Sequence, residues 1–414
     1  MKRSTFAALN ITLALVVIIV ISLVLFLTWD ESPPNDADLR LARLNIPEDD
    51  NAFTWYEKAR EKLQYTDDEQ DKLNPILEPE DQVPGPDEWA LAADVVEHNA
   101  EVFDLIGRGI ACERIEVPEI TRYSNELPYL AKWRTMARLM SIRAALLAQQ
   151  GKHREALEQV MAAIRYGHSV QRCRGCLITY LVGVACKGIG YRRFRQVISY
   201  APLNDAELAE YGRQLAPLES NEAALADAFR KEYVASANLV DDMLAGKYSP
   251  TRKKMPAFLL LPNQTKRLFA EAARTVIGNV PRCPAEYEVP EAEQLAQQIR
   301  EFKPAALRNF TGKLILGMIL PATYHAPKEG LGDRMSNRVA RLLIALRRYQ
   351  LATGTLPGSL DQLVPKYIDV VPVDLFDGKP IRYDPAKKII YSVGTDCEDN
   401  AGDEWKDTVV KIEF

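Results

Sequence analysis

An apolar run near the N-terminus constrains the fold of this chain more than any other feature. After Lys2 and Arg3, no charged residue occurs before Asp30, and residues 6–29 are predominantly apolar. As a helix, these 24 residues would extend about 36 Å, which exceeds the roughly 30 Å thickness of a membrane's hydrocarbon core. The sequence therefore predicts a single transmembrane helix within residues 1–29.

The charges on either side of this run predict its orientation. Basic residues precede it, and the acidic residues Asp30 and Glu31 follow it. By the positive-inside rule, the N-terminus is then cytoplasmic and the bulk of the chain is extracytoplasmic, which in a bacterium would be periplasmic. A cleaved signal peptide is the alternative, but its apolar core would be only about 7–15 residues long and would end in a small-residue cleavage site. We therefore expect an uncleaved signal anchor in the inner (plasma) membrane.

The length of the chain predicts more than one folded unit after the anchor. A chain of 414 residues is too long for one ordinary core, and the net charge of −5 argues against nucleic-acid binding. We expect an α+β protein with a linker over residues 30–50, an α-helical extracytoplasmic domain over 51–325 and a C-terminal α/β module over 333–414.

Helical periodicity is clearest over residues 129–168. The run breaks at Gly151, and Ala156 and Ala163 follow at offsets that resemble the turn and second helix of a tetratricopeptide repeat. Only one copy occurs, whereas repeat architectures need about three units for stability. A helix hairpin within an α-helical domain is therefore favoured over a peptide-binding repeat groove. Further helices are expected at residues 176–200, 204–246 and 291–308.

One stretch of the chain is basic and free of acidic residues. Residues 159–204 contain no Asp or Glu. Outside the cytoplasm, such a stretch could contact anionic lipid headgroups, cell-wall polymers or an acidic partner. The alternative, which we favour, is that the arginines extend from a helix bundle into water. The arginines concerned are Arg165, Arg172, Arg174, Arg192, Arg193 and Arg195.

The sequence CRGC places Cys173 and Cys176 at a spacing used by redox and zinc sites. No second such pair follows, and the chain has only four histidines. The surrounding run is typical of a helix, in which the two thiols would be neighbours on one face. We expect two small, buried core residues rather than a metal or redox site.

The last eighty residues change in character. An amphipathic helix begins near Asp333 and ends at Gly354, and a short helix is expected at residues 359–364. Three strands are then predicted, because each segment is short, rich in β-branched or aromatic residues and bounded by turn residues. The strands are expected at residues 381–384, 389–393 and 409–414, as a three-stranded antiparallel sheet.

Three ordered motifs in this module carry a resemblance to a known family. They read "YQLATGTLPGSLDQLV", "VPVDLFDGKPIRY" and "YSVGTDCEDNAGDE". In this order they resemble the soluble domain of the major pseudopilins of bacterial type II secretion systems, over residues 333–414. The resemblance implies a long helix on a small sheet, with a final loop that binds calcium in that family. The chain departs from the family in lacking the pilin-type processing site at its N-terminus, and in having Cys397 where the loop usually has glycine.

The residues of this loop predict a cation site independently of the family. Six acidic residues occur over 396–407. Calcium takes about 6–8 oxygen ligands, and clustered carboxylates repel one another without a cation. The candidate calcium ligands are Ser392, Asp396, Asp399 and Asp403. The alternative is a solvated acidic loop.

No recognisable catalytic motif occurs in the sequence. There is no G-x-S-x-G, no H-E-x-x-H and no phosphate-binding glycine loop. The favoured function is a non-enzymatic interaction or scaffold role in the cell envelope, possible partners being other envelope proteins. The alternatives are an accessory component of a type II secretion or pilus-like system, and an envelope hydrolase whose class the sequence does not indicate.

Overall fold

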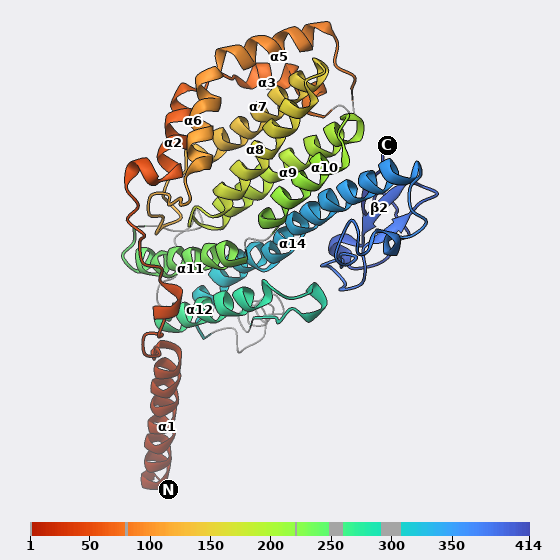
Figure 1. The fold of residues 1–414 in the computed structure, drawn as a ribbon. Helices are drawn as coiled ribbons and strands as arrows, with labels where there is room; N and C mark the ends of the chain where they lie inside the picture. The colour runs from red at the N-terminus through yellow and green to blue at the C-terminus, as the bar shows by residue number, and fades with distance from the viewer. Residues whose placement is uncertain (1, 79–81, 220–221, 248–259, 291–307) are drawn as a thin grey trace.

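The computed structural model describes residues 2–78, 82–219, 222–247, 260–290 and 308–414. Over these ranges the chain is mainly helical, with one small sheet near the C-terminus (Figure 1). The helices are α1 (Lys2–Thr28), α2 (Ala52–Lys62), α3 (Asp67–Lys72), α4 (Asn74–Leu77), α5 (Pro86–His98), α6 (Ala100–Ala111), α7 (Tyr129–Gln149), α8 (His153–Gln171), α9 (Leu177–Tyr200), α10 (Asp205–Leu215), α11 (Glu222–Leu244), α12 (Pro262–Asn279) and α14 (Phe310–Thr353). The expected helix at 291–308 lies, up to residue 307, outside the described residues.

Helix α1 projects from the rest of the molecule (Figure 1). Its segment Ile11–Thr28 is long and apolar enough to cross a membrane, and none of that segment is buried against the body. It is the one such helix among the described residues. This length and composition fit a membrane anchor or a signal sequence.

Residues 29–44, which we call the strap, attach α1 to the body. The Asp30 carboxylate accepts hydrogen bonds from the backbone N–H groups of Asn263 (2.7 Å) and Gln264 (3.1 Å) at the start of α12. A carboxylate there satisfies unpaired amides and the positive end of the helix dipole. Further along the strap, Leu39 is buried, and the Leu44 N–H donates to the Glu116 carboxylate. The segment expected to be a linker is therefore attached to the body by separate contacts along its length, although most of its residues are exposed.

We predict that Asp30→Ala lowers the free energy of unfolding by about 0.5–2 kcal/mol, because α12 loses a capping carboxylate. Urea denaturation of the full chain in detergent measures this. Glu48→Ala, at an exposed position just after the strap, is the matched control and should leave stability unchanged. Equal stability of the two variants would show that the Asp30 contact does not hold the strap.

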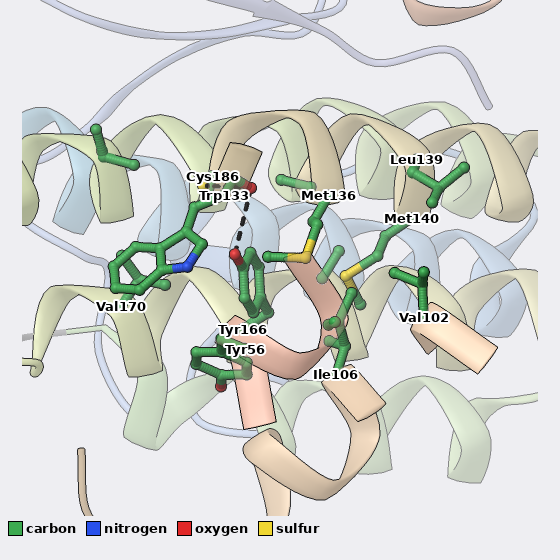
Figure 2. Packing of buried hydrophobic residues seen from close by; sticks show 14 of the residues in the cluster. Tyr56, Val102, Ile106, Trp133, Met136, Leu139, Met140, Tyr166, Val170 and Cys186 are labelled. Atoms are coloured by element: carbon green, nitrogen blue, oxygen red, sulfur yellow. Dashed lines mark hydrogen bonds between the residues drawn. The ribbon is translucent and has the colours of Figure 1, made fainter. Parts of the chain in front are cut away.

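Helices α7, α8 and α9 form the centre of the body, and the predicted hairpin at 129–168 is confirmed as α7 and α8. Rings from three helices meet in the core (Figure 2): Trp133 of α7 lies 6.3 Å from Tyr56 of α2, and Tyr56 lies 4.9 Å from Tyr166 of α8. Helices α8 and α9 also approach closely at Gly167, where an added Cβ would lie 2.5 Å from the backbone nitrogen of Lys187. A larger residue at Gly167 would therefore push the two helices apart.

A buried ion pair connects α9 to α14. The Lys187 Nζ lies 2.7 Å from the Asp333 Oδ2, and both side chains are buried. The same ammonium donates to the Leu218 carbonyl, and the Gln171 amide donates to Asp333. Burial lowers the pKa of Lys187, and the Asp333 carboxylate partly offsets this effect.

His168 lies on α8, partly buried in the same region. Burial, followed by the positive charges of Lys187 and Arg172, lowers its pKa to about 3. In the unfolded chain its pKa is about 6.5, so below that pH the unfolded state binds a proton that the folded state does not. The stability contributed by neutral His168 is therefore complete above about pH 6.5 and is lost as the pH falls toward 3.

We predict that wild-type protein loses more stability than His168→Gln between pH 7.5 and pH 5. The difference is at most about 1.4 kcal/mol for each pH unit below the unfolded pKa. Thermal melting of both proteins at the two pH values measures it. Equal losses would contradict the assignment of a buried, neutral His168.

Helix α14 differs from the expectation. The sequence predicts a helix that begins near Asp333, but α14 begins at Phe310 and continues through Pro321 and Pro327 as one helix of 44 residues. A proline removes one backbone hydrogen bond, and contacts with α9, α10, α11 and α12 hold both halves of α14 in place. Residues 326–332, which separate the two expected domains, are therefore helical and lie inside α14.

The helix expected at 204–246 is also interrupted. The structure has α10, a 3-10 turn η3 (Ala216–Leu218) and α11 in its place. Pro217 occupies η3, where its missing N–H and fixed backbone angle favour a turn over a continuous α-helix. The other short 3-10 segments are η1 (Ala37–Leu39), η2 (Glu48–Asp50), η5 (Pro284–Glu286), η7 (Leu360–Leu363) and η8 (Gly394–Asp396).

The predicted three-stranded antiparallel sheet is confirmed. Its strands are β1 (Arg382–Asp384), β2 (Ile389–Ser392) and β3 (Thr408–Lys411), in the order β1-β2-β3. Ile390 pairs with Tyr383 on one side and Val410 on the other, and its side chain is buried with Leu343 and Leu346 of α14. On another face of α14, Ala340 and Ile344 pack with α8, α9 and α10. One helix thus joins the sheet to the helical body.

Candidate functional site

The C-terminal module is organised around Asp374, a carboxylate that is fully buried. Its Oδ1 accepts hydrogen bonds from the Phe376 N–H (3.0 Å) and the Ser392 hydroxyl (2.9 Å). Its Oδ2 accepts from the Val393 N–H (2.9 Å) and from Arg382 Nη1 (3.0 Å). Asp374 therefore joins the segment before β1 to the end of β2.

Arg382 supplies positive charge to the acidic groups of this module. Its guanidinium contacts the carboxylates of Asp377, Asp374 and Asp399. The hydrogen bond with Asp377 is the main cause of the raised pKa of Arg382. The sequence analysis missed both Asp374 and Arg382. A signal was present, because an Asp between apolar residues in "VPVDLF" is typical of a buried, hydrogen-bonded carboxylate.

The candidate calcium ligands each have a partner within the protein. The Ser392 hydroxyl donates to Asp374, and Asp399 accepts from Arg382 Nε (3.2 Å). Asp396 and Asp403 accept backbone N–H groups two residues further along the chain. In the described part of the chain, no three or more His, Cys, Asp or Glu side chains are grouped to hold a metal ion. Calcium binding here stays a prediction, and it would require Ser392 and Asp399 to change partners.

Residues 394–407, which we call the acidic loop, are closed by Asp407. Its buried carboxylate accepts the N–H groups of Asn400 (3.3 Å) and Gly402 (2.7 Å). Gly402 has a φ of +78°, which glycine adopts at little cost. The remaining acidic side chains of the loop are exposed, as is Trp405 at 97%. The exposed acids are Asp396, Glu398, Asp399, Asp403 and Glu404.

A groove of about 530 Å³ lies between α10, the second half of α14 and residues 365–373. Basic side chains from all three segments line it, and we call it the basic groove. Its basic residues are Arg213, Arg338, Arg341, Arg348 and Lys366. The acidic residues in its lining are Glu219 and Asp369. Glu219 pairs with both Arg338 and Arg341, and two carboxylates beside the groove pair with the other arginines, Glu210 with Arg213 and Asp205 with Arg348. The excess of positive charge over the lining is therefore small.

The interior of the basic groove also offers apolar contact. Val370 and Val373, which are 71% and 42% exposed, contribute to its lining. The ring of Tyr367 lies 5.3 Å from the Arg348 guanidinium and 5.0 Å from the Lys366 ammonium. Such a combination of cations and an aromatic face suits ligands that carry both carboxylates and a large apolar group.

The arginines of residues 159–204 do not share one face. Arg193 is buried, with its guanidinium bonded to the Ile76 carbonyl, and burial lowers its pKa to about 10. Arg165 donates to Gln214 of α10, whereas Arg192 pairs with Glu78 after α4. Arg174 pairs with Asp227 of α11. These contacts favour the interpretation of packed and solvated helix-bundle arginines over a single anionic contact surface.

The CRGC sequence lies in the turn between α8 and α9, so the expected helical arrangement of its cysteines is wrong. The turn is held by the Val117 N–H, which donates to the Cys173 carbonyl, and Arg174 has a φ of +54°. The expected burial is confirmed, because Cys173 and Cys176 are both buried and free. Burial raises the pKa of Cys173 to about 12, which keeps the thiol protonated and unreactive.

A second cavity, of about 430 Å³, contains a carboxyl group of unusual pKa. Burial raises the pKa of Glu232, and its oxygens accept from the Tyr123 hydroxyl (2.8 Å) and the Leu177 N–H (3.4 Å). Glycosidases need two carboxyl groups across the reacting bond. Glu232 is the only carboxylate among the described residues that line this cavity, and it caps the start of α9.

Comparison of the chain with known protein families, with curated proteins and with solved structures finds no match. The function of the chain is therefore inferred from its own residues and their geometry.

Proposed function

We propose that this chain is a membrane-anchored envelope protein that holds its C-terminal module outside the membrane as a non-enzymatic interaction platform. The observation that carries the proposal is the attachment of the strap to the body. Because Asp30 caps α12 directly after the apolar helix, the body would stand in a fixed position relative to a membrane that α1 crosses. A flexible tether would not fix that position.

The connection continues from the body to the C-terminal module. Helix α14 packs on the body with one face and on the sheet with another, and the Lys187–Asp333 pair joins it to α9. The order of a long helix followed by three antiparallel strands agrees with the proposed pseudopilin-like module. The exposed surfaces of that module, the acidic loop and the basic groove, are where we place its contacts.

Membrane attachment is tested by fractionation of cells that express the full chain. We expect the protein to stay in the membrane pellet after an alkaline carbonate wash, and a variant without residues 1–28 to be soluble. N-terminal sequencing of the mature protein distinguishes an anchor from a signal peptide. A mature chain that begins after residue 28 and is released by the wash would overturn the proposal.

A further inference from the structure

The acidic loop and the basic groove have complementary chemistry. The loop exposes a group of carboxylates, of which Asp399 and Glu404 pair with Arg382 and Lys411. The groove is lined by guanidinium and ammonium groups. Arginine side chains bind carboxylates with paired, charge-assisted hydrogen bonds. Arg213 pairs with Glu210 and Arg341 pairs with Glu219, yet the two arginines keep 68% and 41% of their side-chain exposure, so a carboxylate from outside can still reach their guanidinium groups.

Trp405 gives the acidic loop an apolar anchor. Its side chain is 97% exposed, and Asp403 and Glu404 precede it directly. Exposed tryptophans are uncommon on monomeric surfaces, and buried tryptophans contribute strongly to protein interfaces. The exposed side chains of Val370 and Val373 and the Tyr367 ring, which line the basic groove, would accept an indole group.

The loop does not fill the groove of its own chain, because Trp405 is almost fully exposed. We propose that the acidic loop of one copy, with Trp405 as its anchor, inserts into the basic groove of a second copy. This contact joins two different surfaces, so it repeats head to tail. The proposal rests on the interaction role given above and names the partner as another copy of this chain.

The position of the two surfaces is compatible with neighbours in one membrane. Figure 1 shows the sheet of the C-terminal module and α10 together on the side of the body away from α1. The loop belongs to this sheet, and the groove lies between α10 and α14. Copies with the same orientation can therefore bring a loop and a groove to similar distances from the membrane.

Self-association of the full chain in detergent tests the proposal, with sedimentation velocity as the readout. We expect wild-type protein to associate at low salt and to dissociate as salt screens the charges. Trp405→Ala and the double variant Arg213→Glu/Lys366→Glu should each bind at least tenfold more weakly. The double variant Lys132→Glu/Lys152→Glu makes the same charge change at exposed positions on the body and should associate like wild type.

Mixing the two deficient variants tests the head-to-tail geometry. Trp405→Ala keeps an intact groove, and Arg213→Glu/Lys366→Glu keeps an intact loop. In an equimolar mixture, the loop of the second variant should bind the groove of the first. Dimers should therefore form, and larger oligomers should not. A mixture that stays monomeric would overturn the proposal, as would wild-type protein that stays monomeric at low salt. Membrane attachment is measured separately and does not depend on Trp405. Either monomeric result would therefore overturn the self-association proposal without contradicting the proposed membrane-anchored role.

Discussion

Replacing Asp333 with alanine is expected to lower the free energy of unfolding by about 3–5 kcal/mol, because it leaves the Lys187 ammonium buried without a counter-charge. The Lys187 Nζ now lies 2.7 Å from the Asp333 carboxylate, and neither side chain reaches solvent. Urea denaturation of the full chain in detergent measures the loss. Because Asp333 lies on α14, which packs on both the body and the sheet, we also expect the C-terminal module to pack less tightly on the body.

The double variant Lys187→Met/Asp333→Leu removes both charges of the pair. It therefore separates the effect of losing the ion pair from the effect of leaving one buried charge without a partner. Replacing both partners of a buried ion pair by apolar residues is often neutral or stabilising. We therefore expect the double variant to be more stable than either of its single changes, Lys187→Met or Asp333→Leu. A double variant whose destabilisation equals the sum of the two single changes would show that the residues do not act as a pair.

Trp133→Ala is expected to cost about 3–5 kcal/mol of unfolding free energy, because it opens a cavity where α2, α7 and α8 meet. Trp133 is fully buried and lies beside Tyr56 and Tyr166 (Figure 2). The Tyr166 hydroxyl also donates to the Trp133 carbonyl (3.3 Å).

Trp405→Ala is the matched control for this change, since it removes the same side chain from a position that is 97% exposed. Its effect on the unfolding of the monomer should stay within about 0.5 kcal/mol. Both variants are compared by urea denaturation under conditions where the protein is monomeric. Similar losses for the two variants would contradict the packing around Trp133.

Local patterns in the sequence predicted much of the fold. Helical spacing on both sides of Gly151 predicted the α7–α8 hairpin, and short β-branched segments bounded by turns predicted all three strands. Helices and strands depend on residues that are close in the chain, so the spacing of apolar residues in the sequence indicates them directly. The apolar helix α1 was predicted for the same reason.

Contacts between distant residues were not predictable in this way. Lys187 is one basic residue in an acid-free stretch, and its partner Asp333 lies 146 residues further on. Within the candidate site, the acidic loop was predicted, but the ion pair of its Asp399 with Arg382 of β1 was not. The start of the last long helix was predicted near Asp333, whereas packing on four other helices keeps α14 continuous from Phe310 through its two prolines.

The most direct test of the proposed anchored platform is the location of the C-terminus. Alkaline phosphatase is active only outside the cytoplasm, so we would fuse it after Phe414 of the full chain and measure its activity in intact cells. An active enzyme that remains in the membrane fraction is the predicted result. An inactive fusion, together with activity of a cytoplasmic reporter at the same position, would contradict the account.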